Sequence, residues 1–243
     1  MDFYQSISNY YQHIFPLNKA QLTYINSARE DDKKQLSILD IGCAIGDLSL
    51  ELSDYFKEVI GIDLDEGMIN KANEKGKNKG NLHFCLENML HIDQSFGVNR
   101  FDLIACFGNT LVHLGSEEVV LDFFRSACSS LKDDGKLLFQ IINYDRIIDQ
   151  KINFLPTIEN ESIKFERNYM LHLDSKKVDF ETLLTIKESG LCIKNSIPLL
   201  ALRKATVRGL LQEAGFTDIK FYSNFKRDAS TANSMPLVVE AKV

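Results

Sequence analysis

Residues 38–48 read Ile-Leu-Asp-Ile-Gly-Cys-Ala-Ile-Gly-Asp-Leu, an apolar run that ends in a carboxylate and leads through a glycine-spaced turn into a helix start. Glycines at a strand-to-helix turn let the backbone bend tightly and approach a ligand closely. A second acidic residue, Asp63, follows 23 residues after Asp40, at the end of the next apolar run. A nucleotide-binding α/β unit places at this spacing the carboxylate that accepts ribose hydroxyls. The stretch therefore predicts a nucleotide-binding strand–turn–helix unit.

The charge of the turn indicates which nucleotide it binds. A dinucleotide cofactor places its pyrophosphate on such a turn, which then usually carries a third, central glycine. Here Ala44 stands between Gly42 and Gly46, and Asp40 lies beside the loop, where its carboxylate would repel phosphate. S-adenosylmethionine has no phosphate and carries a cationic ammonium and sulfonium, so an acidic loop suits it. The Cβ of Ala44 is tolerated in the turn if its φ is negative.

With these residues the chain resembles the class I S-adenosylmethionine-dependent methyltransferases, whose first motif commonly runs Asp-x-Gly-Cys-Gly-x-Gly. Ala44 departs from that motif at a glycine position. The segments Gly108-Asn109-Thr110 and Asn143-Tyr144-Asp145 resemble the G-N-S/T and N-Y-D motifs of the glycine/sarcosine N-methyltransferase-like branch. The resemblance covers residues 36–148 and matches the following insertion only loosely. It implies S-adenosylmethionine as cofactor and a small-molecule acceptor, such as an amine or amino-acid-like metabolite.

Short β-rich runs alternate with longer helical stretches from Leu36 to Asn143, which predicts an α/β fold with a parallel sheet covered by helices. The predicted strands are Ser37–Ile41, Val59–Asp63, Leu82–Cys85, Phe101–Cys106 and Lys136–Asn143, the last one preceded by a turn at 133–135. The predicted helices are Asp47–Phe56, Glu66–Lys77 and Ser116–Leu131. Nearer the C-terminus we expect a helix at Thr206–Ala214 and a closing hairpin of Asp218–Tyr222 and Leu237–Lys242.

The alternation changes after Asn143. Residues 163–193 give short β-like runs with polar turns, which predicts an antiparallel insertion. The resemblance implies a doubly wound, seven-stranded, mostly parallel Rossmann-like sheet whose last strand is antiparallel, with the insertion acting as a substrate lid. The expected organisation is an N-terminal helical cap (1–35), an α/β cofactor domain (36–148 and 200–243) and an inserted β-rich lid (149–199).

The residues expected to bind the cofactor come from the turn, from the segments after the second, third and fourth strands, and from the N-terminus: Tyr11, Asp40, Gly42, Cys43, Ala44, Gly46, Asp63, Leu64, Met68, Asn88, Met89, Phe107 and Gly108. The resemblance implies that Met68 packs on adenine, although an ordinary core role is the alternative. Asn88 stands where the family places an acidic residue near the adenine amino group, and its side-chain carbonyl can accept a hydrogen bond. A simple Asx turn is the alternative at Asn88.

The backbone N–H of Met89 can donate to a ring nitrogen, and Gly108 permits close approach to the sulfonium end. Tyr11 belongs to an N-terminal aromatic stripe that also contains Tyr4, Tyr10 and Phe15. Such stripes usually pack against a core. The resemblance implies that this one also folds over the cofactor.

Three polar residues are predicted to border the transferred methyl group: Asn109, His113 and Tyr144, with His113 or Tyr144 as the proton acceptor. A surface or core role is the alternative for His113. The resemblance places Arg203, before the last helix, where that branch grips a substrate carboxylate, and it gives Tyr144 a part in substrate binding. A bidentate guanidinium–carboxylate contact would suit Arg203. A helix-leading surface arginine is the alternative.

The composition narrows the class of partner. With 243 residues and 44% hydrophobic content, the chain can bury one full core. A net charge of −6 and a pI near 5.4 argue against a protein that grips nucleic acid through its phosphates. No Asn/Asp-Pro-Pro-Tyr or Pro-Cys motif follows the fourth predicted strand, so a small metabolite is favoured over nucleic acid, and a protein substrate stays open.

Five scattered cysteines indicate reduced thiols in a cytoplasmic protein, and no Cys-x-x-Cys or His-Glu-x-x-His spacing supports a metal site. The polar and aromatic N-terminus predicts neither a signal peptide nor a membrane span. Monomer and dimer are both open. Two other functions also remain: an NAD-dependent oxidoreductase, which Asp40 and Ala44 disfavour, and a non-catalytic S-adenosylmethionine-binding subunit, whose cofactor half would look identical.

Overall fold

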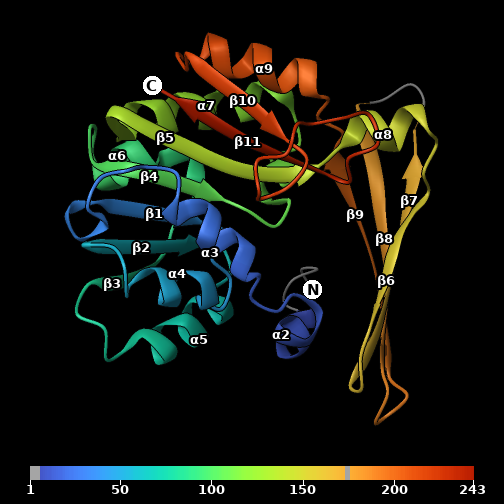
Figure 1. Ribbon diagram of the computed structural model, residues 1–243. Helices are drawn as coiled ribbons and strands as arrows, with labels where there is room; N and C mark the ends of the chain where they lie inside the picture. Colours follow the sequence, from blue (N-terminus) through green and yellow to red (C-terminus); the bar gives the residue numbers. More distant parts are fainter. Residues whose placement is uncertain (1–5, 173–175) are drawn as a thin grey trace.

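The computed structural model describes residues 6–172 and 176–243, so Tyr4 lies outside the described part. Seven strands form one sheet in the order β10-β11-β5-β4-β1-β2-β3 (Figure 1). β11 runs antiparallel to both of its neighbours, β10 and β5, and the other neighbouring pairs in this sheet are parallel. The strands are β1 (Ser37–Ile41), β2 (Glu58–Asp63), β3 (Leu82–Leu86), β4 (Phe101–Cys106), β5 (Leu131–Ile142), β10 (Asp218–Tyr222) and β11 (Pro236–Lys242). The predicted fold class is confirmed, including the antiparallel last strand.

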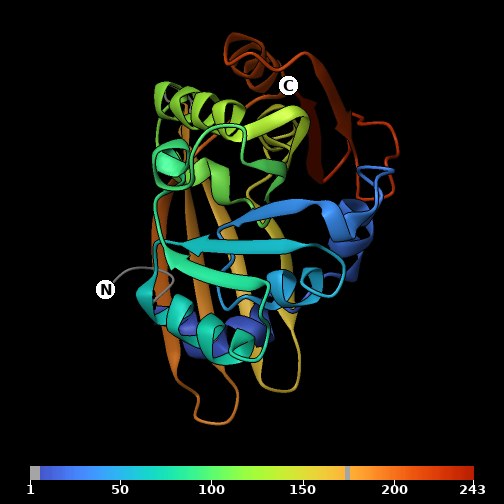
Figure 2. The same ribbon diagram turned by 90° about the vertical axis from the view of Figure 1, so that its left-hand side faces the viewer.

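Helices cover both faces of this sheet, as Figure 2 shows. The α-helices are α2 (Tyr11–Ile14), α3 (Lys19–Asn26), α4 (Asp47–Leu52), α5 (Glu66–Gly76), α6 (Ile92–Phe96), α7 (Glu117–Ser130), α8 (Tyr144–Asp149) and α9 (Lys204–Glu213). Four 3-10 turns are η1 (Ser8–Tyr10), η2 (Lys33–Gln35), η3 (Met89–His91) and η4 (Thr110–Leu114). Polar side chains cap α7 and α5 near their predicted starts, since Ser116 Oγ accepts from the N–H of Val119 and Asp65 Oδ1 from that of Met68. None of the described helices is long and apolar enough to cross a membrane.

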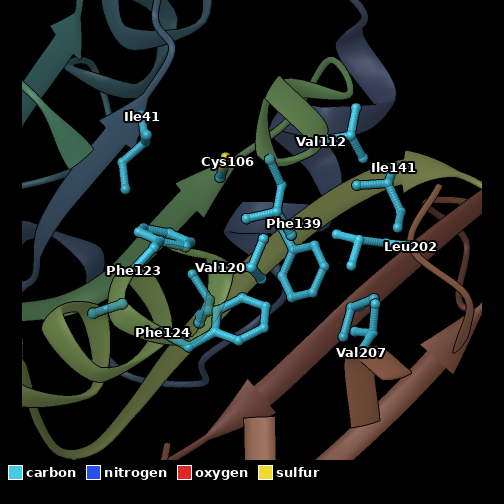
Figure 3. Close-up of a cluster of buried hydrophobic side chains, with 14 of the residues drawn as sticks. Ile41, Cys106, Val112, Val120, Phe123, Phe124, Phe139, Ile141, Leu202 and Val207 are labelled. Carbon is cyan, nitrogen blue, oxygen red and sulfur yellow. The ribbon is translucent and has the colours of Figure 1, made fainter. Parts of the chain in front are cut away.

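Two apolar clusters hold the helices against the sheet. On one face, Phe123 and Phe124 of α7 and Val207 of α9 pack onto Phe139 of β5 (Figure 3). On the other face, Tyr24 of α3 belongs to the cluster that joins α3 and α4 to β1 and β2. Strands buried on both faces read as continuous apolar runs rather than alternating ones. This explains why the β1 and β4 boundaries are predicted correctly.

Elsewhere the boundaries differ, for local and for tertiary reasons. Helix α4 ends at Leu52 rather than Phe56, and just beyond it the hydroxyl of Ser53 donates to the carbonyl of Leu50 at 2.6 Å, which competes with regular helical bonding. Helix α9 begins at Lys204 rather than Thr206, because the carboxylate of Asp145 accepts from the Lys204 N–H at 2.9 Å. A cap supplied from a distant part of the chain leaves no local signal.

The predicted turn at 133–135 lies inside β5 and forms a bulge. The register with β4 passes from Phe101↔Leu131 to Leu103↔Lys136, so β5 carries extra residues over this step. Asp134 there has a φ of +65°. Residues 133–135 therefore do bend the chain, but they do so within the strand, which starts at Leu131 instead of Lys136.

The insertion forms a second sheet in the order β6-β7-β8-β9, antiparallel throughout. Its strands are β6 (Phe154–Glu159), β7 (Ile163–Leu171), β8 (Lys177–Ile186) and β9 (Cys192–Leu200). This sheet stands beside the edge at which the parallel strands end, and β9 lies against η4 (Figure 1). Ile7 and Ile14 of the N-terminal segment pack on one of its faces, against Phe165 and Leu184. The two sheets and the N-terminal segment thus enclose the carboxyl edge.

Candidate active site

Two adjoining cavities, of about 270 and 340 Å³, lie at the carboxyl edge of the parallel strands. They share Tyr11, Gly42, Ala44, Phe107 and Gly108. The first is also lined by Ile41, Ile62, Asp63, Leu64, Asp65, Met68, Glu87, Met89, Thr110, His113, Leu114 and Ile197. The second is also lined by Ile14, Phe15, Pro16, Leu17, Asn18, Gln21, Asp40, Cys43, Ile45, Asp47 and Leu48. Together they form one continuous cleft, the position at which open α/β sheets bind ligands.

The turn after β1 is tied to β2 by the backbone. The N–H groups of Gly42 and Cys43 both donate to the carbonyl of Ile62, at 2.9 and 3.0 Å. Gly46 begins α4 with a φ of +77°, and a Cβ there would lie 2.5 Å from the ring of Phe84. The glycine at this position is therefore required by packing as well as by conformation.

The expectation of a negative φ at Ala44 is wrong. Its φ is +48°, in the left-handed region that glycine adopts easily. The N–H of Ala44 donates to Asp63 Oδ2 at 2.9 Å, and this charge-assisted hydrogen bond holds the strained conformation. The turn thus keeps the shape of a glycine-containing loop without the glycine.

Two carboxylates lie under the turn. Asp63 accepts from Ala44 N–H through Oδ2 and from Asp65 N–H through Oδ1, and burial raises its pKa against the lowering effect of these bonds. Asp40 is only 3% exposed and accepts a 2.6 Å hydrogen bond from Ser49 Oγ. Burial raises the pKa of Asp40 to about 7, Ser49 opposes the rise, and the charge of Asp63 adds to it.

The three consecutive residues that follow β3 differ in whether they reach the cleft. Glu87 and Met89 line the first cavity, whereas Asn88 does not. Asn88 Oδ1 accepts from the N–H of Leu90 at 3.0 Å and caps η3, which is the Asx turn left open as the alternative. Glu87 accepts from Asn88 N–H and from Ser95 Oγ at 2.8 and 2.7 Å. The acidic side chain that reaches the cavity from this segment is therefore Glu87, one position earlier than the residue expected.

The N-terminal segment closes the cleft from above. Tyr11 lines both cavities and packs on Ala44, Ile45 and Met68. Burial, followed by the charge of Asp63, raises the pKa of its phenol above the ordinary value. Tyr11 is thus a neutral hydroxyl at neutral pH, held over the turn.

The residues predicted around the methyl group separate into two sets. His113 lines the first cavity. Asn109 lies just outside the wall, where Oδ1 accepts from the N–H of Ile142 at 2.9 Å and Nδ2 donates to the Tyr144 hydroxyl at 3.4 Å. Tyr144 is fully buried. Arg203 lies away from both cavities and pairs with Asp145 and Asp149 at 3.2 and 2.8 Å.

The charge of the cleft identifies a class of ligand. Five carboxylates line it, from Asp40, Asp47, Asp63, Asp65 and Glu87, and no lysine or arginine is found among the described lining residues. A pyrophosphate would be repelled there, whereas a sulfonium and an ammonium are attracted. The residues present therefore fit S-adenosylmethionine.

Comparison with known proteins agrees with this geometry. The methyltransferase domain family matches residues 38–135. A glycine/sarcosine N-methyltransferase of Aphanothece halophytica is 29% identical over 205 residues, covering 84% of this chain and 74% of that protein. One from Halorhodospira halochloris is 28% identical over 202 residues, covering 79% and 70%. These likenesses support an S-adenosylmethionine-dependent methyltransferase of class I. Its cofactor is S-adenosylmethionine.

Solved structures share the fold of this methyltransferase over nearly the whole chain. The CcbJ methyltransferase of Streptomyces caelestis has a TM-score of 0.81 at 18% identity and covers 98% of this chain and 96% of its own. The S-adenosylmethionine-bound CalS10 of Micromonospora echinaspora, described as an amino pentose methyltransferase, has a TM-score of 0.72 at 18% identity and covers 100% and 99%. These likenesses favour methyl transfer over the two alternatives that the sequence leaves open, the NAD-dependent oxidoreductase and the non-catalytic subunit.

Several lining residues of the methyltransferase are absent from the predicted set. Asp65 and Thr110 directly follow predicted residues, and their carboxylate and hydroxyl groups could have marked them as site candidates. Ile197 comes from β9 of the inserted sheet, and Gln21 from α3. No local pattern marks these two, because only the tertiary arrangement brings them to the cleft.

We expect Ala44→Gly to stabilise the methyltransferase by up to about 1 kcal/mol, because glycine removes the cost of a Cβ at positive φ. The hydrogen bond to Asp63 is made by the backbone, so the affinity for S-adenosylhomocysteine should stay unchanged. Urea unfolding and calorimetric titration measure the two quantities. A destabilised variant would show that the Ala44 side chain contributes packing that outweighs the strain.

Proposed function

We propose that this methyltransferase transfers a methyl group to the nitrogen of a small-molecule amine, amino-acid-like in character. S-adenosylmethionine supplies a methyl group on a cationic sulfur that is a good leaving group. The proposal rests on the side chains that line the cleft. Carboxylates line the half beside the turn, and the other half ends at His113, Leu114 and Ile197 under the inserted sheet. The names of the two N-methyltransferase relatives support a nitrogen acceptor.

The cofactor roles follow from the lining. Asp63 accepts the ribose hydroxyls, and Met68 and Met89 pack on the adenine, with Glu87 and the N–H of Met89 at its polar edge. Leu64 flanks the same end. Asp40, Gly42 and Cys43 surround the amino-acid end, and Phe107 and Gly108 face the sulfonium. Gly46, which lines neither cavity, shapes the turn. Tyr11 covers the turn and excludes water.

On the acceptor side, His113 takes the proton of the amine, because it lines the cavity and histidine is the most common general base in enzymes. Asn109 and Tyr144 act one layer further out. Asn109 joins the end of β4 to the N–H of Ile142 in β5 and donates to the Tyr144 hydroxyl. These two residues therefore position the loop that carries Gly108 and His113.

A screen with labelled S-adenosylmethionine over amines, amino acids and phenols tests the proposal. We expect label in amine products, and we expect His113→Gln to lower kcat by about 10²–10⁴-fold while S-adenosylhomocysteine affinity is unchanged. Asp122→Asn, an exposed change on α7, is the control and should leave both untouched. Label found only in phenols would contradict the amine acceptor. Full turnover by His113→Gln would contradict the assignment of His113 as the base.

The pKa of Asp40 predicts a pH dependence of cofactor binding. Below about pH 7 the carboxyl of the free enzyme is protonated, so binding that favours the carboxylate must also release a proton. Affinity for S-adenosylhomocysteine should therefore fall about tenfold per pH unit below pH 7 and level off above it. The free enzyme should lose stability as pH rises from about 4 to 7, because ionising buried Asp40 is costly. Asp40→Asn should flatten both profiles in calorimetry and unfolding experiments, and an unchanged profile in that variant would contradict the assignment.

The lining of the cleft and the state of the cysteines bear on the partner and on the location of the protein. A small molecule, and neither nucleic acid nor a membrane, is the expected partner, because a cleft without lysine or arginine among its described lining residues offers no phosphate grip. The five cysteines are all unpaired, which supports a reducing, cytoplasmic location.

A further inference from the structure

Two apolar side chains from distant parts of the chain form a wall of the first cavity. Leu114 is the last residue of η4, and Ile197 belongs to β9, which lies against η4. Both residues line the first cavity, and both are only partly buried at the margin of the main apolar cluster. Part of each side chain therefore stays open to the cavity.

A row of aromatic rings flanks Ile197 on the inserted sheet. Ile197 pairs in register with Phe180 of β8, and Phe180 pairs with Tyr169 of β7. Cross-strand partners share a face, so the three side chains lie in one row. The rings of Phe180 and Tyr169 are 5.5 Å apart, and that of Tyr169 lies 6.3 Å from that of Tyr144, which is fully buried. Such close packing holds Ile197 at a fixed place on the cavity wall.

The charged groups of the first cavity lie on the other side of β1. Its carboxylates come from the ends of β2 and β3, and they are Asp63, Asp65 and Glu87. In the order of the sheet, β2 and β3 are separated by β1 from β4, the strand that leads into η4. An acceptor beside His113 therefore meets a base on one side and the apolar wall of Leu114 and Ile197 on the other.

We propose that the acceptor amine carries an alkyl or aryl substituent, and that Leu114 and Ile197 set the size of this substituent. The inference rests on the proposed function, because it assigns the group that accompanies the amine nitrogen. An apolar substituent against this wall leaves water at a gain in free energy. A charged substituent would lose its hydration there and find no polar atom on either side chain. The wall thus orients the acceptor, with its nitrogen at His113 and its apolar part under the inserted sheet.

The test uses the whole enzyme saturated with S-adenosylhomocysteine, titrated by calorimetry with straight-chain primary amines from methylamine to octylamine. We expect the affinity to rise about two- to fourfold with each added methylene until the chain reaches the wall, and then to stop rising. Ile197→Ala should move this break to longer chains, by about two carbons, because it removes most of the side chain. Ile197→Phe should move the break to shorter chains. The affinity for S-adenosylhomocysteine should stay unchanged in both variants.

Lys194→Ala is the matched control on the same strand. Lys194 is exposed, and its position three residues before Ile197 places it on the opposite face of the sheet. This variant should keep the break of the wild type. Because the two Ile197 variants shift the break in opposite directions, either one that folds tests the proposal by itself.

Two results would overturn the proposal: a wild-type affinity that does not depend on chain length, and a break that stays in place in a folded Ile197 variant. Loss of S-adenosylhomocysteine affinity in Ile197→Ala would place this residue at the cofactor and would also count against it. Failure of the proposed function looks different. In that case the break persists and moves with Ile197, but label from S-adenosylmethionine reaches no amine.

Discussion

Asp63→Asn should weaken the binding of S-adenosylhomocysteine about 100-fold, or about 3 kcal/mol. The carboxylate holds the turn through Ala44 N–H and Asp65 N–H, and it is the group that we assign to the ribose hydroxyls. An amide keeps the size of the side chain but loses the negative charge and one acceptor oxygen. Calorimetric titration at pH 8 measures the loss.

Asp122→Asn on α7 provides the matched control for Asp63→Asn. Its side chain is 65% exposed and lies outside the two cavities, so the same chemical change there should leave the affinity unaltered. Thermal unfolding of both variants separates a lost ligand contact from a lost fold. Full affinity in a folded Asp63→Asn enzyme would contradict the ribose assignment.

Gly46→Ala should destabilise the enzyme by about 2–4 kcal/mol, the largest stability effect that we expect from one methyl group. The φ of +77° costs an alanine about 1–2 kcal/mol, and the new Cβ would lie 2.5 Å from Phe84 and 2.9 Å from Ala72. Both neighbours are held by the β3–α5 packing, so the clash has no cheap relief. Urea unfolding measures the change.

Gly209→Ala, in the interior of α9, is the matched control with the opposite sign. A Cβ at Gly209 meets nothing within 4 Å, and alanine is the better helix former by about 1 kcal/mol. We expect this variant to be equally or more stable than the wild type. A Gly46→Ala enzyme as stable as Gly209→Ala would show that the turn relaxes, and the close packing argument would fail.

The sequence predicts the central sheet well because its signals are local and strong. The glycine-spaced turn, the apolar runs and the Ser116 cap are each readable within a few residues, and β1, β4 and β10 have the predicted bounds. The errors lie where distant groups decide the outcome. Asp145 caps α9 from another element, and the register with β4 turns the predicted loop at 133–135 into a bulge.

For the candidate site, too, the correct predictions come from local signals and the errors from distant parts of the chain. Gly42, Ala44, Asp63, Met68 and Met89 were predicted and line the first cavity, since each lies at or within a few residues of a strand end, whereas Gly46 of the same turn lines neither cavity. Asn88 was expected on the cleft wall and Glu87 lies there instead, because an Asx cap and a ligand contact look alike in sequence. The acceptor side depends on how the inserted sheet folds back, so Ile197 carries no local signal. The positive φ of Ala44 shows that alanine can replace the glycine of the motif without changing the backbone of the turn. The replacement only raises the conformational free energy of the turn.

A crystal structure of the enzyme with S-adenosylhomocysteine tests the central claim most directly, namely that this carboxylate-lined cleft holds the cofactor through Asp63 and Asp40. We expect both ribose hydroxyls within hydrogen-bond distance of Asp63, adenine between Met68 and Met89, and the ammonium group on the Asp40 side of the turn. Ligand density elsewhere, with neither carboxylate touching the sugar or the amine, would contradict it.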